Sequence, residues 1–127
     1  MSKKRVLLID DEEEFTELLS MNLLRTGDFE IGIVNDAPKA VEYARTFLPD
    51  IILLDIVMPG IDGGDVASAL RSDPDLCNIP VVLISALVAN SEIDDDEIAQ
   101  AGDRIVLAKP VKMEKLLRVI GHLIGSN

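Results

Sequence analysis

Carboxylates, a hydroxyl and an ammonium group each follow a short aliphatic run in this chain of 127 residues. The residues are Asp10, Asp11, Asp55, Ser85 and Lys109. Three carboxylates that lie close together cannot all stay ionised without a counter-charge. A lysine supplies one positive charge, and a hard divalent cation such as Mg²⁺, which prefers oxygen ligands, would supply two more. The same charges suit a phosphoryl group, with a carboxylate beneath it as the nucleophile.

Five short runs of aliphatic residues must position these groups. The runs are 6–9, 51–54, 81–84 and 105–108, with a weaker one at 31–34. Because they do not alternate with polar residues, they are typical of parallel strands buried on both faces. Helical segments are predicted between them, so we expect a β-α unit repeated five times: an α/β, doubly wound, five-stranded parallel sheet. Merging the runs into buried helices is the alternative, which their length and flanking turn residues disfavour.

Apolar residues at helical spacing predict the buried helix faces. The stripes are Phe15, Leu18, Leu19 and Leu23; Ala37, Val41, Ala44 and Leu48; Val66 and Leu70; and Met113, Leu116, Leu117, Ile120 and Ile124. Residues 91–101 are a weaker, very acidic helical candidate. In open parallel sheets, sites gather beyond the carboxyl ends of the strands. We therefore expect the five polar residues at one edge, with Asn35 and Asp36 outside that cluster.

Composition excludes several classes of function. Twelve Lys and Arg against 23 Asp and Glu give a net charge of −11. Such a surface repels phosphate backbones and anionic lipids, which argues against direct nucleic-acid or membrane binding. Cys77 is the only cysteine, which excludes an internal disulfide and cysteine-based metal clusters. The chain has no apolar run near the roughly 20 residues that span a bilayer and no signal-peptide pattern, so we expect a cytoplasmic protein.

The polar residues and their neighbours resemble the marks of a bacterial two-component response-regulator (CheY-like) receiver domain. They are Asp10-Asp11, the stretch Asp55-Ile56-Val57-Met58-Pro59-Gly60-Ile61-Asp62-Gly63, Ser85-Ala86 and Lys109-Pro110. The resemblance covers about residues 4–124, so residues 1–127 are interpreted as a single receiver domain with no output domain in this chain. It implies a flavodoxin-like (βα)5 fold with strand order 2-1-3-4-5.

The resemblance also implies a role for each site residue. Asp55 would accept the phosphoryl group, Ser85 would bond it and Lys109 would pair with it. Mg²⁺ would be held by Asp11, Asp55 and the backbone carbonyl of Val57, with Asp10 acting mainly through water. The implied function is a phosphorylation-controlled signalling module, not an enzyme beyond its own phosphotransfer and slow autodephosphorylation. Its partners would be a sensor histidine kinase or histidine phosphotransfer protein, and an unknown output partner.

Three other functions remain to be compared. A haloacid-dehalogenase-like phosphatase needs an acid two residues after its nucleophile, where this chain has Val57. A flavodoxin-like electron carrier needs a first loop that accepts an anionic phosphate, whereas residues 10–14 are all acidic. The third is a receiver-like binding module that takes no phosphate. The intact acids, Ser85 and Lys109 argue against this module without excluding it.

Overall fold

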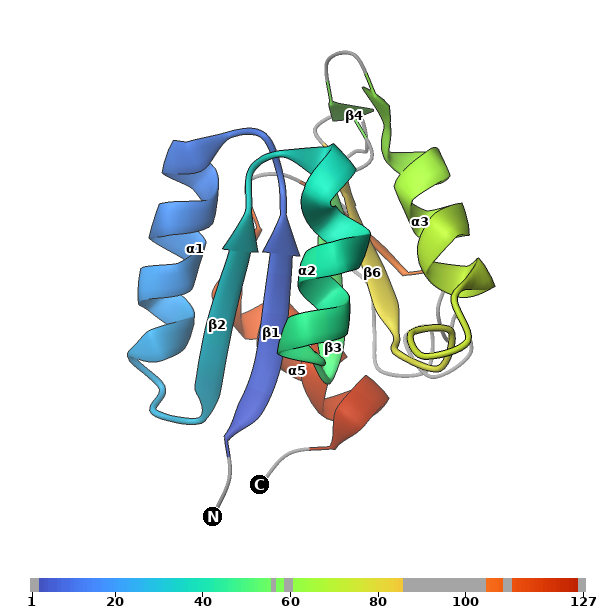
Figure 1. Cartoon of the computed structure of the whole chain (residues 1–127). Helices are drawn as coiled ribbons and strands as arrows, with labels where there is room; N and C mark the ends of the chain where they lie inside the picture. The colour runs from blue at the N-terminus through green and yellow to red at the C-terminus, as the bar shows by residue number, and fades with distance from the viewer. Residues whose placement is uncertain (1–2, 56, 59–60, 86–104, 109–110, 126–127) are drawn as a thin grey trace.

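The five aliphatic runs form one parallel sheet. A computed structural model of the chain describes residues 3–55, 57–58, 61–85, 105–108 and 111–125. The sheet strands are β1 (Lys4–Ile9), β2 (Phe29–Val34), β3 (Ile51–Asp55), β6 (Val81–Ser85) and β7 (Val106–Ala108). They lie in the order β2-β1-β3-β6-β7 (Figure 1), and every neighbouring pair is parallel. Counted among these five strands, this is the predicted order 2-1-3-4-5.

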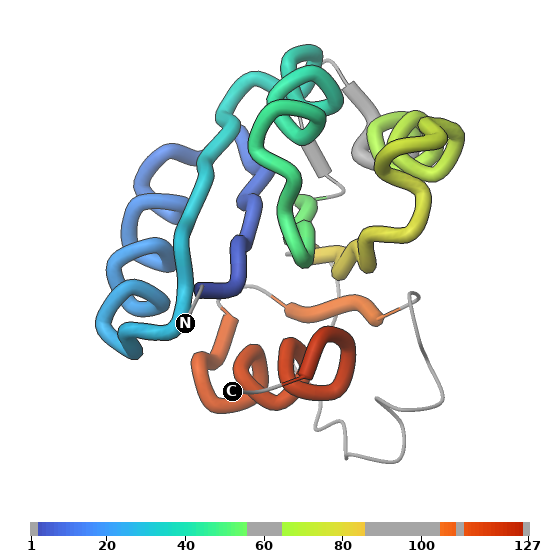
Figure 2. Tube along the Cα trace, turned by 60° about the horizontal axis from the view of Figure 1, so that its bottom comes forward, coloured from blue at the N-terminus to red at the C-terminus, as the bar shows by residue number. Residues whose placement is uncertain are grey.

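Helices cover both faces of the sheet. They are α1 (Glu13–Leu24), α2 (Ala40–Phe47) with a 3-10 turn η1 (Ala37–Lys39) before it, α3 (Gly63–Ser72) and α5 (Met113–Ile124). Figure 2 shows α5 on the opposite side of the strands from α2 and α3. The predicted helix over residues 91–101 lies outside the described residues.

The sheet separates two apolar clusters, as expected for strands buried on both faces. Residues of β1 alternate between them: Val6 and Leu8 pack with α1 and α5, while Leu7 and Ile9 pack with α2 and α3. The first cluster includes Leu19, Leu23, Leu53, Val82, Leu116, Val119 and Ile120. The second includes Ala40, Ala44, Leu54, Val66, Leu70 and Val81. This double burial explains why the strand sequences show no alternation.

Three predicted helix-face residues are wrong. Leu117 is 37% exposed, because α5 buries Leu116, Val119 and Ile120 instead. Leu18 is 60% exposed, because α1 turns Thr16, Leu19 and Leu23 toward the sheet instead. Leu48 is 54% exposed, because α2 ends at Phe47 and Leu48 adopts a left-handed conformation with φ 51°. Spacing alone did not separate the inner from the outer face of these helices.

A short antiparallel hairpin was not predicted. Strand β4 (Val57–Met58) pairs with β5 (Ile61–Asp62), and α3 begins at the next residue, Gly63. Figure 1 shows this hairpin beyond the carboxyl ends of the main strands. Two-residue strands are too short to produce a periodic signal, and the glycines and proline of this stretch indicated only turns.

Gly32 in β2 allows an aromatic ring to approach the strand closely. A Cβ atom at this position would lie 2.9 Å from Cε1 of Tyr43 and 3.2 Å from Cε2 of Phe47. The two rings are 5.8 Å apart between centroids. The guanidinium of Arg5 lies 5.6 Å from the centre of the Phe47 ring. The missing side chain of Gly32 thus lets α2 pack its aromatic residues against the sheet.

Candidate functional site at the carboxyl edge of the sheet

Strand register brings three of the predicted site residues to the same edge. Ile9 pairs with Leu54, so Asp10 and Asp55 both follow directly at the ends of neighbouring strands. Asp55 in turn pairs with Ile84, which places Ser85 one step further along β6. Asp10 and Asp55 are each 2% exposed and Ser85 is 1% exposed. Polar groups buried this deeply at the end of apolar strands need compensating partners.

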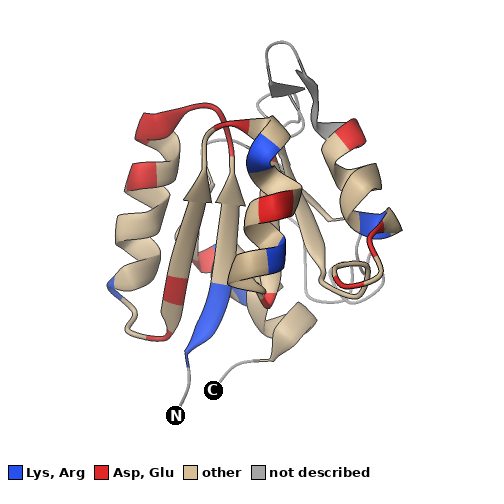
Figure 3. Ribbon diagram, in the orientation of Figure 1, with Lys and Arg blue, Asp and Glu red and all other residues tan. Residues whose placement is uncertain are grey.

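The predicted acid cluster forms. One carboxylate oxygen each from Asp10, Asp11 and Asp55 lies within 4.8 Å of the other two. Asp11 is exposed while the other two acids are buried, so the cluster opens to solvent on one side. Figure 3 shows the negative residues along the turn that leads from β1 into α1.

The spacing of these oxygens fits a small, hard cation. Ligands at about 2.0–2.1 Å from an octahedral Mg²⁺ lie no more than about 4.2 Å apart, which small side-chain adjustments would reach from here. Two ionised carboxylate oxygens no more than 4.8 Å apart repel each other by at least about 3.5 kcal/mol at an effective dielectric constant of about 20. A divalent cation would offset this repulsion, and an all-oxygen donor set is the one Mg²⁺ prefers.

Asp10 is held by the backbone around it. Its N–H donates to the carbonyl of Val34 at 3.1 Å, and its Oδ1 accepts the N–H of Glu12 at 2.9 Å. The carbonyl of Asp10 accepts a hydrogen bond of 2.7 Å from Nδ2 of Asn35. Asn35 therefore contacts the acid-bearing turn, and the expectation that it lies apart from the cluster is wrong for this residue.

Asn35 and Thr16 are the site neighbours that sequence reasoning missed. Nδ2 of Asn35 also donates to Oγ1 of Thr16 at 3.0 Å. A signal for Asn35 was present, since a parallel β2 beside β1 pairs Val34 with Ile9 and so places residue 35 next to residue 10. Thr16 had no comparable signal, because a threonine among helical residues indicates neither burial nor contact with a site.

For two of the predicted site residues, the structure describes either the backbone alone or nothing. Val57 lies in β4, where it pairs with Asp62, and the role of its carbonyl as a metal ligand stays a prediction. Lys109 lies outside the described residues.

A hollow of about 640 Å³ lies elsewhere, on the α2 side of the sheet, and none of the three acids lines it. Arg5, Tyr43 and Phe47 are among its lining residues. The acid cluster is therefore marked by the proximity of its charged groups and not by this hollow.

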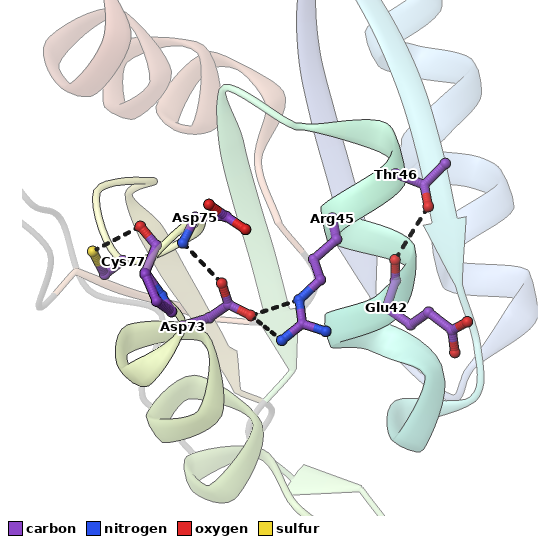
Figure 4. A network of polar contacts seen from close by, with 7 residues as sticks. Glu42, Arg45, Thr46, Asp73, Asp75 and Cys77 are labelled. Carbon is purple, nitrogen blue, oxygen red and sulfur yellow. Dashed lines mark hydrogen bonds and ion pairs between the residues drawn. The ribbon is translucent and has the colours of Figure 1, made fainter.

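A second polar network joins α2 to the turn after α3. Nε of Arg45 donates to Oδ2 of Asp73 at 2.7 Å, and Asp75 donates its N–H to Oδ1 at 2.8 Å (Figure 4). The N–H of Asp75, followed by the Arg45 guanidinium, lowers the pKa of Asp73 against the opposing effect of burial. Sequence reasoning missed this pair, because the two residues are separated by 28 positions.

The response regulator receiver domain model matches residues 6–121, nearly the whole of the described fold. The chain belongs to this family. It is 41% identical over 108 residues to the response regulator PleD of Caulobacter vibrioides, covering 84% of this chain and 23% of PleD. It is 30% identical over 125 residues to the DNA-binding response regulator MtrA of Mycolicibacterium paratuberculosis, covering 98% of this chain and 53% of MtrA.

Solved receiver structures share the fold. The receiver domain of the sensor histidine kinase PA1611 from Pseudomonas aeruginosa superposes with a TM-score of 0.76 at 27% identity, covering 98% of this chain and all of that domain. That structure holds a magnesium ion in its active-site cleft. The chemotaxis protein CheY4 of Vibrio cholerae, at 24% identity, shows the same fold with a TM-score of 0.79, covering 96% of this chain and 99% of CheY4.

Membership of the family makes this chain a signalling domain of two-component systems. The chain spans about a quarter of PleD and about half of MtrA, so the activities of those whole proteins do not transfer with the receiver domain. None of the helices in the described ranges combines the length and the apolar character needed to cross a membrane.

Proposed function

We propose that this receiver domain accepts a phosphoryl group on Asp55 and thereby controls the binding of an output partner. One observation carries the proposal: the buried Asp55 carboxylate ends β3 with oxygens of Asp10 and Asp11 within 4.8 Å. A buried carboxylate beside two other acids is costly unless a cation offsets the charge, and a nucleophile for phosphoryl transfer needs such a cation site beside it. The donor would be the phosphohistidine of a sensor histidine kinase or a histidine phosphotransfer protein.

The proposed reaction is a single displacement at phosphorus. A carboxylate oxygen of Asp55 forms the new O–P bond while the N–P bond to the donor histidine breaks, and the electron pair leaves on the imidazole nitrogen. Asp10 and Asp11 would hold Mg²⁺ together with Asp55 and the carbonyl of Val57. When bound, Mg²⁺ supplies positive charge to the phosphoryl oxygens.

Two further side chains have proposed roles in this reaction. The Ser85 hydroxyl, at the end of the neighbouring strand, would donate a hydrogen bond to a phosphoryl oxygen. Lys109 would pair with another oxygen. Both groups would act by positioning and charge stabilisation, which carry most of the catalysis in phosphoryl transfer.

Phosphodonor labelling tests the proposal. Incubation of the parent with a small acyl phosphate and Mg²⁺ should add one hydroxylamine-labile phosphoryl group, detected by intact mass. Asp55→Asn should abolish labelling, whereas Asp28→Asn, an exposed acid at the opposite end of the sheet, should label like the parent. Labelling of Asp55→Asn at the parental level would disprove the acceptor assignment. A folded parent that never labels, even with phosphorylated histidine donors, would favour the phosphate-independent binding module.

A further inference from the structure

The turn that carries Asp10 and Asp11 is braced from the neighbouring strand. Asn35, the first residue after β2, uses the two hydrogens of its amide nitrogen on two acceptors. One is the carbonyl of Asp10 at 2.7 Å, and the other is Oγ1 of Thr16 at 3.0 Å. The amide therefore ties the end of β2 both to the end of β1 and to the first turn of α1.

Thr16 extends the brace into the helix. Its side chain is buried, and Oγ1 donates to the carbonyl of Glu13 at 3.0 Å while it accepts from Asn35. The N–H of Thr16 donates to the carbonyl of Glu12 at 3.1 Å. Residues on both sides of Asp11 are thus fixed by hydrogen bonds, although Asp11 itself is exposed.

Asn35 acts on the backbone of Asp10 rather than on its carboxylate. Asp10 is held through its N–H to Val34, its carbonyl to Asn35 and its Oδ1 to the N–H of Glu12. The carbonyl that Asn35 binds belongs to the peptide group that joins Asp10 to Asp11. Loosening this one contact would let the two acids move relative to Asp55.

We propose that Asn35 and Thr16 are positioning residues that determine which divalent cation the acid cluster prefers. Mg²⁺ needs near-octahedral oxygen ligands at about 2.0–2.1 Å, whereas Ca²⁺ accepts about 2.3–2.6 Å and irregular geometry. A rigid turn keeps the carboxylates at the spacing that Mg²⁺ demands. A loosened turn would bind Ca²⁺ about as tightly as the rigid turn does, because Ca²⁺ accepts longer and less regular ligand distances. This inference rests on the proposed function, because it takes the acid cluster as the cation site of the receiver domain.

The experiment measures dissociation constants for Mg²⁺ and for Ca²⁺ separately, by calorimetric titration of the apo protein. Asn35→Ala removes the amide without adding charge, and Thr16→Val removes the hydroxyl at nearly constant volume. We expect about a tenfold weaker Mg²⁺ affinity in Asn35→Ala, the lower end of the usual effect of outer-shell partners. Ca²⁺ affinity should change much less, so the preference for Mg²⁺ should fall. Thr16→Val should change the preference in the same direction, and Thr16→Ser should restore it.

Thr26→Val is the matched control, because Oγ1 of Thr26 donates to the carbonyl of Leu23 at 2.8 Å near the other end of α1. It should destabilise the fold without altering either dissociation constant. If Asn35→Ala does not fold, the Thr16→Val and Thr16→Ser pair decides the question alone. The inference would be overturned if the folded Asn35 and Thr16 variants had the dissociation constants of the parent, or if they lost affinity equally for Mg²⁺ and Ca²⁺. Either result would leave the proposed function intact. A parent that binds no Mg²⁺ would overturn both.

Discussion

Arg45 and Asp73 form an ion pair between α2 and the turn after α3 in which only one partner is shielded from solvent. The Arg45 side chain is 58% exposed, whereas that of Asp73 is 3% exposed. The carboxylate is satisfied on both oxygens, by the guanidinium on Oδ2 and by the N–H of Asp75 on Oδ1. The turn after α3 is therefore fixed to α2 by a group that must be ionised to make these contacts well.

This pair predicts a pH dependence of stability. The pKa of Asp73 is lowered in the fold, first by the N–H of Asp75 and then by Arg45, against the effect of burial. A lowered pKa contributes stability above the unfolded value of about 3.9, and this stability is lost as pH falls through the folded value. Asp73→Asn should therefore lower the melting temperature at pH 7, and the difference from the parent should shrink below about pH 4.

Asp36→Asn provides the comparison for that experiment. Asp36 pairs with Lys39 at 3.8 Å, and both side chains are largely exposed. Exposed pairs contribute about 0–1 kcal/mol, so this variant should melt close to the parent at every pH. Equal melting temperatures for Asp73→Asn and the parent at pH 7 would contradict the role given to the buried carboxylate.

Magnesium should stabilise the folded domain. A ligand that binds only the folded state adds RT ln(1 + [L]/Kd), about 1.4 kcal/mol at ten times the Kd. Asp11→Asn removes one of the clustered charges, so it should lose most of this stabilisation and melt no lower than the parent without Mg²⁺. Thermal unfolding with and without Mg²⁺ measures both effects, and Asp28→Asn should retain the full Mg²⁺ response. A parent whose melting temperature ignores Mg²⁺ would contradict this prediction.

Gly32→Ala should strain the contact between β2 and α2. The new Cβ would lie 2.9 Å from Cε1 of Tyr43. The cost should be near the lower end of the about 1–3 kcal/mol typical of overpacking, because the Tyr43 ring is partly exposed and can move. In a Tyr43→Ala background the same substitution should cost less. Denaturant unfolding of the four proteins gives the coupling energy, and a value near zero would show that the ring does not limit residue 32.

Leu48→Gly should stabilise the protein. Leu48 caps α2 in the left-handed region at φ 51°, and its side chain is mostly exposed. Relief of about 1–2 kcal/mol of backbone strain exceeds the about 0.5–1 kcal/mol of extra unfolded-state entropy that glycine brings. Leu24→Gly, at an exposed residue with ordinary helical geometry, should instead destabilise by about 1 kcal/mol. If the two substitutions change the free energy of unfolding in the same direction relative to the parent, the explanation is refuted.

Features that depend on residues close together in the sequence could be predicted better than contacts between residues far apart in it. The strands and the acid cluster could be predicted, because Asp10 and Asp55 directly follow aliphatic runs typical of parallel strands. The strand order followed from the resemblance to the receiver family. The exposure of Leu18 and Leu117 could not be predicted, since helical spacing does not say which of several apolar residues faces the sheet. The exposure of Leu48 could not either, since the spacing did not show that α2 ends at Phe47. Contacts that depend on side-chain reach across the fold, such as Arg45 with Asp73 and Asn35 with Thr16, leave no mark in the local sequence.

Lys4 opens β1 and Ile124 closes α5 at the same end of the molecule (Figure 1), and Lys4 and Gly125 line one small hollow there. The acids lie at the far end of β1, which at about 3.3–3.4 Å per residue is some 20 Å away. A label, an affinity tag or a sensor-chip tether joined to either terminus would therefore project from the face opposite the acid cluster. Attachment through the first or the last residues would therefore leave the edge with the acid cluster accessible to partners in solution.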